Sequence, residues 1–266
     1  IEMIGFYKSL KIFFCLLFLI RNFVHSQNYF PADPYFTLVN EKNQFDGKYD
    51  INSNLFKPFF YDLNNEKKFS INYRTEFYLN DNVPNQENMD VRYFAKGYSF
   101  FSSFQFSLNS KYAYLIFEPY FRNNKSINIE PIYRYDTFNY LNDFEIQKNN
   151  VVNDKSLRNF LFFLNLKKIG IGYHRGNRWW GPGIHSTLQM TNNTWPIGSI
   201  IAGNLKEIKI GKIGLMGLYS FSKIKDLGNP IQKYHTALNG QITYYGSTIL
   251  SIGFSRNYLS GGDKSI

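Results

Sequence analysis

The sequence predicts an all-β fold, namely an antiparallel transmembrane (outer-membrane) β-barrel that is incomplete at its C-terminus and has an irregular or partly helical N-terminal segment. Three observations predict this class. From Phe69 onward, apolar and polar residues alternate with a period of two, the spacing of the two faces of a strand. The 266 residues include 27 phenylalanines and 21 tyrosines, yet the mean hydropathy is negative. Short turns alternate with longer loops, as expected for outer-membrane barrels.

A soluble β-sandwich is the alternative fold, because it shares the two-residue alternation. It explains the aromatic content less well, since a sandwich of this size does not need so many exposed rings. A lipid-facing outer wall around a wet interior, by contrast, needs aromatic residues interleaved with polar ones. The sequence therefore favours the barrel.

Residues 1–26 are predicted to be a secretory signal peptide. Lys8 and Lys11 supply its positive region, Ile12–Ile20 is its apolar core, and small residues stand at the −3 and −1 positions of a cleavage site. The core is too short to span a bilayer, which takes about 20 apolar residues; an uncleaved anchor is the alternative. Cys15, the only cysteine, lies inside this segment, so the exported chain has no disulfide and no cysteine-ligated metal. Export without a later helical span predicts localisation in the bacterial outer membrane.

The formal charge of +10 is compatible with acidic partners. Removing residues 1–26, which contain three cations and one anion, leaves +8. Lipopolysaccharide phosphates, anionic polysaccharide and nucleic acid all attract a basic surface, but export excludes nucleic acid. Base composition is an alternative explanation, because the abundant Lys, Asn, Ile, Phe and Tyr share AT-rich codons.

The polar segment 27–68 is a candidate periplasmic plug. It contains three prolines and many Asn and Asp residues, and it shows no convincing helical period. Asn52–Leu63 is its one helix candidate. Residues 69–266 follow as the partial barrel.

The barrel strands are predicted from their alternating faces. In Phe69–Leu79 the odd positions are mostly apolar and the even ones polar. The loop Asn80–Met89 precedes a hairpin whose arms meet at the short turn Asn109-Ser110. Asn123–Asp154 breaks the pattern as a long loop, and Phe160–Ile171 alternates only weakly. The remaining predicted hairpins are Lys206–Ile210 with Ile213–Phe221 around Gly211-Lys212, and Leu238–Tyr244 with Leu250–Tyr258 around Gly246-Ser247.

The chain ends in a loop-like stretch, Ser260–Ile266. Exported barrels usually finish in a strand with a terminal aromatic residue, and we count at most about a dozen strands here. We therefore expect an N-terminal portion of a longer barrel, with two unpaired edges.

A rigid aromatic turn lies at the centre of Ile169–Gly198. Arg178–Gly183, with the sequence RWWGPG, holds two of the three tryptophans next to a Gly-Pro-Gly turn. Pro182 fixes its own φ, while the flanking glycines permit positive φ or close backbone approach. The third tryptophan, Trp195, follows an Asn-Asn-Thr step. One interpretation is an aromatic-capped loop needed only for folding.

This stretch resembles the signature of the Wzi family of capsule assembly proteins. The specific part of the likeness is Arg178–Gly183 followed by Ser186–Asn193 and Pro196, and a weaker likeness runs from Leu79 to Pro119. Members of that family are outer-membrane β-barrels with a surface role in holding capsular polysaccharide. The resemblance implies a non-enzymatic protein that attaches capsular or related exopolysaccharide at the cell surface, with outer-membrane lipid or lipopolysaccharide as its other partner.

Seven residues of the stretch are candidate carbohydrate-binding or family-signature residues, because aromatic rings stack on sugars and Arg or Asn side chains bond hydroxyl and acidic groups. They are Arg175, Arg178, Trp179, Trp180, Asn192, Asn193 and Trp195. The competing interpretation is that Arg178 and the tryptophans pack inside the barrel and fix its shape.

Enzymatic and metal chemistry have little support in the sequence. His174 and His185 flank the tryptophans without an acidic neighbour, which argues against zinc. No nucleophile elbow or phosphate-binding loop occurs. Glu76 and Glu118 lie on predicted inner faces of separate strands, where pairing with Arg74 and Arg122 is the alternative to glycoside hydrolysis. We expect no enzyme activity, no cofactor and no metal. A porin-like channel and, with less support, an outer-membrane hydrolase are the alternative functions.

Overall fold

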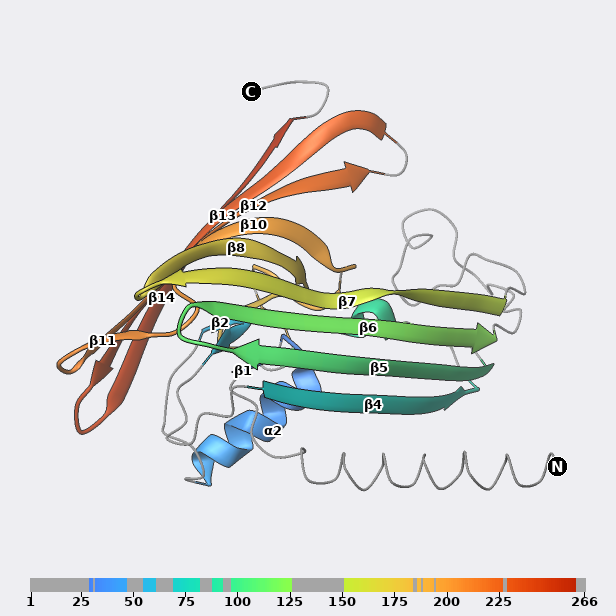
Figure 1. Ribbon diagram of the computed structural model, residues 1–266, viewed down its shortest axis with the longest axis horizontal. Helices are drawn as coiled ribbons and strands as arrows, with labels where there is room; N and C mark the ends of the chain where they lie inside the picture. Colours follow the sequence, from blue (N-terminus) through green and yellow to red (C-terminus); the bar gives the residue numbers. More distant parts are fainter. Residues whose placement is uncertain are drawn as a thin grey trace, which may run out of the picture.

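The two-residue alternation produces one long antiparallel sheet. The computed structural model describes residues 29–30, 32–46, 55–60, 69–81, 88–92, 97–125, 151–183, 186–187, 189–193, 195–226 and 229–261. Its main strands are β4 (Phe69–Asn80), β5 (Gly97–Asn109), β6 (Ala113–Lys125), β7 (Val151–Leu166), β8 (Ile169–Gly176), β10 (Ile197–Gly203), β12 (Ile213–Asp226), β13 (Asn229–Tyr245) and β14 (Ile249–Gly261). They pair in this order, with the short β11 (Ile208–Ile210) added beside β12. The sheet curls strongly from β4 to β14 (Figure 1), and its edges, β4 and β14, do not pair with each other within the described residues.

The smaller elements lie outside the ten-stranded sheet. They are β1 (Tyr29–Phe30), α2 (Pro34–Phe45), β2 (Phe56–Lys57), β3 (Phe59–Phe60), the short 3-10 helix η1 (Asp90–Arg92) and β9 (Trp179–Trp180). β1 pairs with β3, and β2 pairs with β9. Phe56 of β2 packs with Trp180 of β9 and Ala237 of β13, so the N-terminal segment contacts the far half of the sheet.

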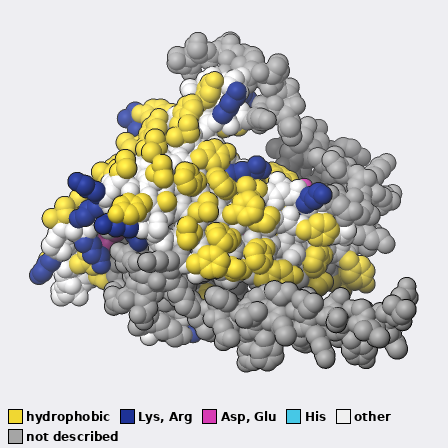
Figure 2. Space-filling view, viewed as in Figure 1, with side chains coloured by type: hydrophobic (Ala, Val, Ile, Leu, Met, Phe, Trp, Pro, Cys, Tyr) yellow, Lys and Arg dark blue, Asp and Glu magenta, His cyan; other side chains and the backbone are white. Residues whose placement is uncertain are grey.

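The two faces of the sheet have opposite chemistry. On β13, Leu238 and Ile242 are 48% and 51% exposed, whereas the intervening Asn239 and Gln241 are each 1% exposed. The same alternation continues across the sheet, because Phe104 on β5 is 41% exposed beside the buried Gln105. Apolar side chains dominate the surface seen in Figure 2 over the central strands. The convex face is therefore apolar and exposed, and the concave face is polar and buried.

Hydrogen-bonded pairs connect the polar side chains of the concave face. Ser70 shares a hydrogen bond of 2.5 Å with Ser107 on the next strand, and the Asn72 amide donates to Gln105 at 3.2 Å. Near the other edge, Ser255 donates to Asn239 at 2.5 Å. Buried polar groups need such partners, and these three pairs connect neighbouring strands across the concave face.

One apolar cluster interrupts the polar layer near the ends of β6 and β7. It contains Tyr114, Ile116, Leu161, Phe163, Ile201, Leu205 and Leu218. This cluster explains why Phe160–Leu164 is apolar at successive positions, since Leu161 and Phe163 point inward while Phe162 and Leu164 are exposed.

Short turns gather at one end of the sheet and long connections at the other. The short turns join β5 to β6, β7 to β8, β11 to β12 and β13 to β14. Gly211, in the predicted Gly211-Lys212 turn, has a φ of 60°, which glycine adopts without strain. The connections from β4 to β5, β6 to β7, β8 to β10 and β12 to β13 leave from the opposite ends of these strands.

Several predicted boundaries are wrong. The helix of the N-terminal segment is Pro34–Phe45, and the described part of the candidate Asn52–Leu63 forms β2 and β3 instead. Asp33-Pro34 is a helix-start pair, with an N-cap residue followed by Pro at the first position. The predicted strand Phe160–Ile171 is two strands, separated by a turn at Lys167-Lys168 in which Lys167 has a φ of 65°.

Other predictions fall partly outside the described residues. The predicted loop Asn123–Asp154 is shorter at both ends, because β6 extends to Lys125 and β7 begins at Val151. The signal peptide, residues 1–26, lies outside the described residues. No helix in the described part of the chain has the length and hydrophobicity to cross a membrane.

Candidate functional site

A buried charge network fills the concave face beside the N-terminal segment. Asp33, which precedes α2, accepts from Arg74 of β4 at 2.8 Å and from Arg158 of β7 at 2.6 Å, and Arg92 of η1 is 3.3 Å away. Burial alone raises the pKa of Asp33, but the charges of Arg92, Arg158 and Arg74 outweigh it and hold the pKa well below its usual value. One carboxylate thus joins three elements.

Arg158 extends this network to two further carboxylates. It donates to Asp90 of η1 at 2.8 Å and to Glu118 of β6 at 2.7 Å. Glu76 of β4 pairs with Arg74 and lies 3.3 Å from Arg92. A cavity of about 20 Å³ remains beside Asp33, Asp90, Glu118 and Arg158, enough for about one water molecule.

The pairing of the inner glutamates differs in one respect from the prediction. Glu76 pairs with Arg74 as expected, but the partner of Glu118 is Arg158, whereas Arg122 pairs with Asp154 at 3.3 Å. The reason is the β-bulge at Glu118/Pro119, where the register between β6 and β7 shifts. Both glutamates are thus held in ion pairs with arginines of the concave face.

The tryptophan turn, Arg178–Gly183, folds onto the concave face. Trp179 and Trp180 are 2% and 1% exposed, and they pair as β9 with Lys57 and Phe56. The Trp179 indole N–H donates to the Gly183 carbonyl at 2.6 Å, and the Gly181 N–H donates to the Leu55 carbonyl at 2.7 Å. The Gly-Pro-Gly turn is therefore closed by its own tryptophan and bonded to the N-terminal segment.

Arg178 is a buried cation in this turn. Its Nη2 donates to Ser199 of β10, and its guanidinium lies 5.5 Å from the Trp180 ring centroid. Burial lowers the pKa of Arg178 to about 10. Among the described residues it forms no ion pair, and its Nη1 lacks a hydrogen-bond partner.

A row of four polar side chains crosses the sheet beneath Arg178. Its members are His174 of β8, Ser199 of β10, Ser222 of β12 and His235 of β13, each opposite the next in the strand register. Ser199 and Ser222 share a hydrogen bond, whereas His174 Nε2 and His235 Nδ1 have no partner within the described residues. A hydrolase needs a serine bonded to its base; neither histidine provides that contact here. Within the described chain, no group of three or more His, Cys, Asp or Glu residues has the geometry of a metal site.

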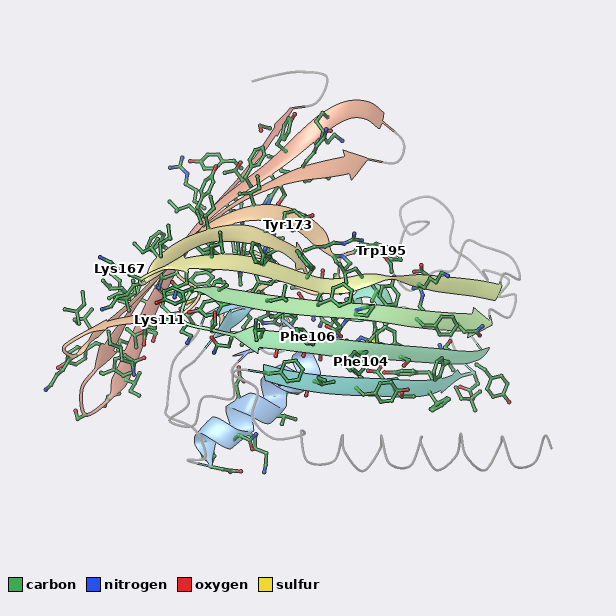
Figure 3. All side chains as sticks on the ribbon, viewed as in Figure 1. Phe104, Phe106, Lys111, Lys167, Tyr173 and Trp195 are labelled. Atoms are coloured by element: carbon green, nitrogen blue, oxygen red, sulfur yellow. The ribbon has the colours of Figure 1, made fainter. Side chains whose placement is uncertain are left out.

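The last part of the same connection reaches the surface. Trp195 is 59% exposed, and the guanidinium of Arg122 lies 5.4 Å from its ring centroid. Asn193 is exposed, with its side-chain oxygen accepting from the Asn88 N–H at 2.5 Å. Figure 3 places Trp195 far along the sheet from Lys111 and Lys167, which mark the end with the short turns. An exposed aromatic ring near an exposed amide suits the apolar face and the hydroxyl groups of a sugar.

The seven candidate residues thus separate into two groups. Arg178, Trp179, Trp180 and Asn192 are buried, so their rings and polar groups do not reach a surface ligand in this conformation. Asn193 and Trp195 are exposed, and Arg175 is partly exposed on the convex side, next to Tyr173 in the alternation. The buried group fits the structural interpretation. In the exposed group, Trp195 and Asn193 are accessible to a sugar at the surface.

Sequence reasoning missed the residues that organise the concave face. Asp33, Arg92 and Arg158 received no assignment, although each has three ionic partners in the network. Asp33-Pro34 carried a detectable helix-start signal. Arg158 had none, because its partners are up to 125 residues away in sequence.

Comparison with known proteins adds no assignment. No protein-family model matches the chain, and neither the curated proteins nor the solved structures contain a match.

Proposed function

We propose that this sheet is part of the wall of a bacterial outer-membrane β-barrel whose exposed face contacts lipid. The observation that carries the proposal is the reversed burial, with large apolar side chains exposed on the convex face and hydrogen-bonded polar side chains buried on the concave face. A water-soluble sheet would bury the apolar set, because apolar surface is unfavourable in water at about 25 cal/mol per Å². In lipid the same arrangement is stable.

A membrane location also requires paired strand edges. Backbone N–H and C=O groups find no hydrogen-bonding water in the hydrocarbon core, so open edges do not persist there. β4 and β14 each have one neighbour among the described strands. The proposal thus requires further strands, or a second chain, against both.

We propose further that the protein attaches capsular or related exopolysaccharide at the cell surface without catalysis. Support comes from the resemblance of Arg178–Gly183 and Ser186–Asn193 to the Wzi signature, and from the exposed Trp195 beside Arg122. Individual ring and hydrogen-bond contacts to sugar are weak, but a polymer repeats them, so that many copies of the contact sum to useful retention.

A porin-like channel has less support. The concave face is rich in arginine, as a channel wall would be, but Arg74, Arg92, Arg122 and Arg158 are paired with carboxylates. The N-terminal segment and the tryptophan turn also occupy this face.

A pull-down on beads coated with an acidic capsular polysaccharide tests the surface role. Trp195→Ala is expected to reduce retention of the full chain at least fivefold without changing its stability, because Trp195 is exposed. Tyr112→Ala removes a ring that is 70% exposed at the short-turn end and is the matched control, with retention unchanged. Trp180→Ala, in the buried group, is expected to lower the free energy of unfolding by about 3–5 kcal/mol. Equal retention by wild type and Trp195→Ala would exclude this contact.

A further inference from the structure

A cavity of about 400 Å³ opens at the short-turn end of the sheet. Three segments line it. They are the β5–β6 turn with Tyr114 of β6, the end of β7 with the Lys167-Lys168 turn, and the stretch from Leu205 to Lys209, which includes the start of β11. Figure 3 shows Lys111 and Lys167 at this same end of the molecule, and Figure 2 shows lysine and arginine side chains gathered there. The volume is within the range of sites for small ligands.

The cavity is strongly basic. Five lysines line it, from three separate segments: Lys111, Lys167, Lys168, Lys206 and Lys209. Lys111, Lys167, Lys168 and Lys209 form no ion pair with any described residue. The one lining carboxylate, Glu207, accepts a hydrogen bond from Tyr245. Convergence of like charges is unfavourable unless an anion offsets it.

Aromatic and amide contacts hold the walls of this cavity in place. Tyr114 is 3% exposed and stacks on Phe163 with ring centroids 6.0 Å apart. The Asn165 amide donates to the Tyr114 hydroxyl at 3.2 Å and to the Lys111 carbonyl at 3.1 Å. Lys206 lies 5.4 Å from the Tyr114 ring centroid. The cavity therefore has a rigid floor beneath flexible cationic side chains.

We propose that this cavity binds a phosphate-bearing anion. Lysine ammonium groups are compact point charges that bind phosphate without fixed geometry, and the cavity has lysines but no arginine, whose planar fork holds carboxylates and phosphates bidentately. Several lysines around one cavity match a multiply charged group better than a single carboxylate. A phosphate on a soluble molecule and a phosphate in a lipid headgroup share this chemistry.

The site is separate from the proposed polysaccharide contact. Trp195 lies away from Lys111 and Lys167 (Figure 3), and no residue of the tryptophan turn lines the cavity. In the proposed barrel the short turns face the periplasm, so the anion would be bound there rather than at the cell surface. Failure of sugar retention and failure of anion binding are therefore independent outcomes.

Titration calorimetry of the full chain in detergent micelles at low ionic strength tests the proposal. Inorganic pyrophosphate represents a soluble phosphate, short-chain phosphatidylglycerol a lipid phosphate, and tricarballylate a phosphate-free anion of high charge. The test variant is Lys168→Gln/Lys209→Gln, which removes two lining charges from two segments and leaves the positive φ of Lys167 in place. Lys155→Gln/Lys223→Gln removes two exposed lysines outside the cavity and is the charge-matched control.

The proposal predicts saturable binding of pyrophosphate or phosphatidylglycerol to wild type. Lys168→Gln/Lys209→Gln should weaken that binding at least tenfold, and the control should leave it unchanged. Binding of pyrophosphate assigns a soluble ligand, and binding of phosphatidylglycerol alone assigns a lipid headgroup. The proposal is overturned if neither probe binds wild type, if tricarballylate binds as tightly as the phosphate probe, or if both double variants weaken binding equally. Unchanged unfolding midpoints confirm that the variants are folded.

Discussion

The convex and concave faces of the ten-stranded sheet contain opposite kinds of side chain. On β13 the convex positions Leu238 and Ile242 are about half exposed, while the concave positions Asn239 and Gln241 are almost fully buried. In a soluble protein the faces would have the reverse chemistry. The difference teaches that the two faces are to be interpreted together: the exposed apolar face is the one that the proposed contact with lipid needs, and the buried polar face needs hydrogen-bond partners.

The largest expected effect on stability comes from removing the ion pairs of Arg158 on the concave face. Arg158→Met keeps a similar side-chain length but leaves Asp33, Asp90 and Glu118 without this cation. We expect the free energy of unfolding to fall by about 4 kcal/mol, because removing one partner of a buried ion pair leaves the other charge buried without compensation. Urea unfolding in micelles measures it, with the exposed Lys155→Met of the same strand as the control. A loss below 1 kcal/mol would mean that the network is solvated.

A charge on the convex face is expected to have the next largest effect. Leu238→Arg, at the middle of β13, should destabilise the chain in bilayers by about 3 kcal/mol, and Tyr244→Arg near the strand end by less than 1 kcal/mol. On a water-exposed face both would be within about 0.5 kcal/mol of wild type. Unfolding measured in bilayers distinguishes the two cases, and equal small effects at both positions would place this face in water.

Asp33→Asn tests the charges of the concave face through the pH dependence of the free energy of unfolding. We expect a loss of about 2 kcal/mol at pH 7, because charged hydrogen bonds to Arg74 and Arg158 are weakened. Since the pKa of folded Asp33 lies below its unfolded value of about 3.9, its contribution is complete above that pH and is lost as pH falls through the folded pKa. The difference between wild type and variant should therefore shrink below about pH 4. Asp46→Asn, which alters an exposed pair with Lys42, is the control and should have little effect at any pH.

The strands and their faces were predictable because they depend on local alternation. Period two in Phe69–Leu79 and in Leu238–Tyr244 assigned each side chain to the correct face. The Lys167-Lys168 turn was not predicted, because lysine at positive φ lacks the usual Gly or Asn signal.

The concave face was much less predictable than the strands. The pairing of β2 with β9 joins residues more than 120 apart in sequence, and so does the contact between Asp33 and Arg158. No local pattern encodes such contacts. The burial of Trp179 and Trp180 followed from this pairing, so their sequence motif alone left both a sugar-binding and a structural role open.

Spin-label accessibility along β13 tests the central claim most directly. In a Cys15→Ser background, single cysteines at Leu238 through Tyr244 are labelled in the full chain reconstituted in bilayers, and collisions with oxygen and with a water-soluble nickel complex are measured. The account predicts an oxygen accessibility with a period of two, high at Leu238, Ile242 and Tyr244, where the nickel complex is excluded. High nickel accessibility at these three positions would show that the apolar face is in water and would contradict the account.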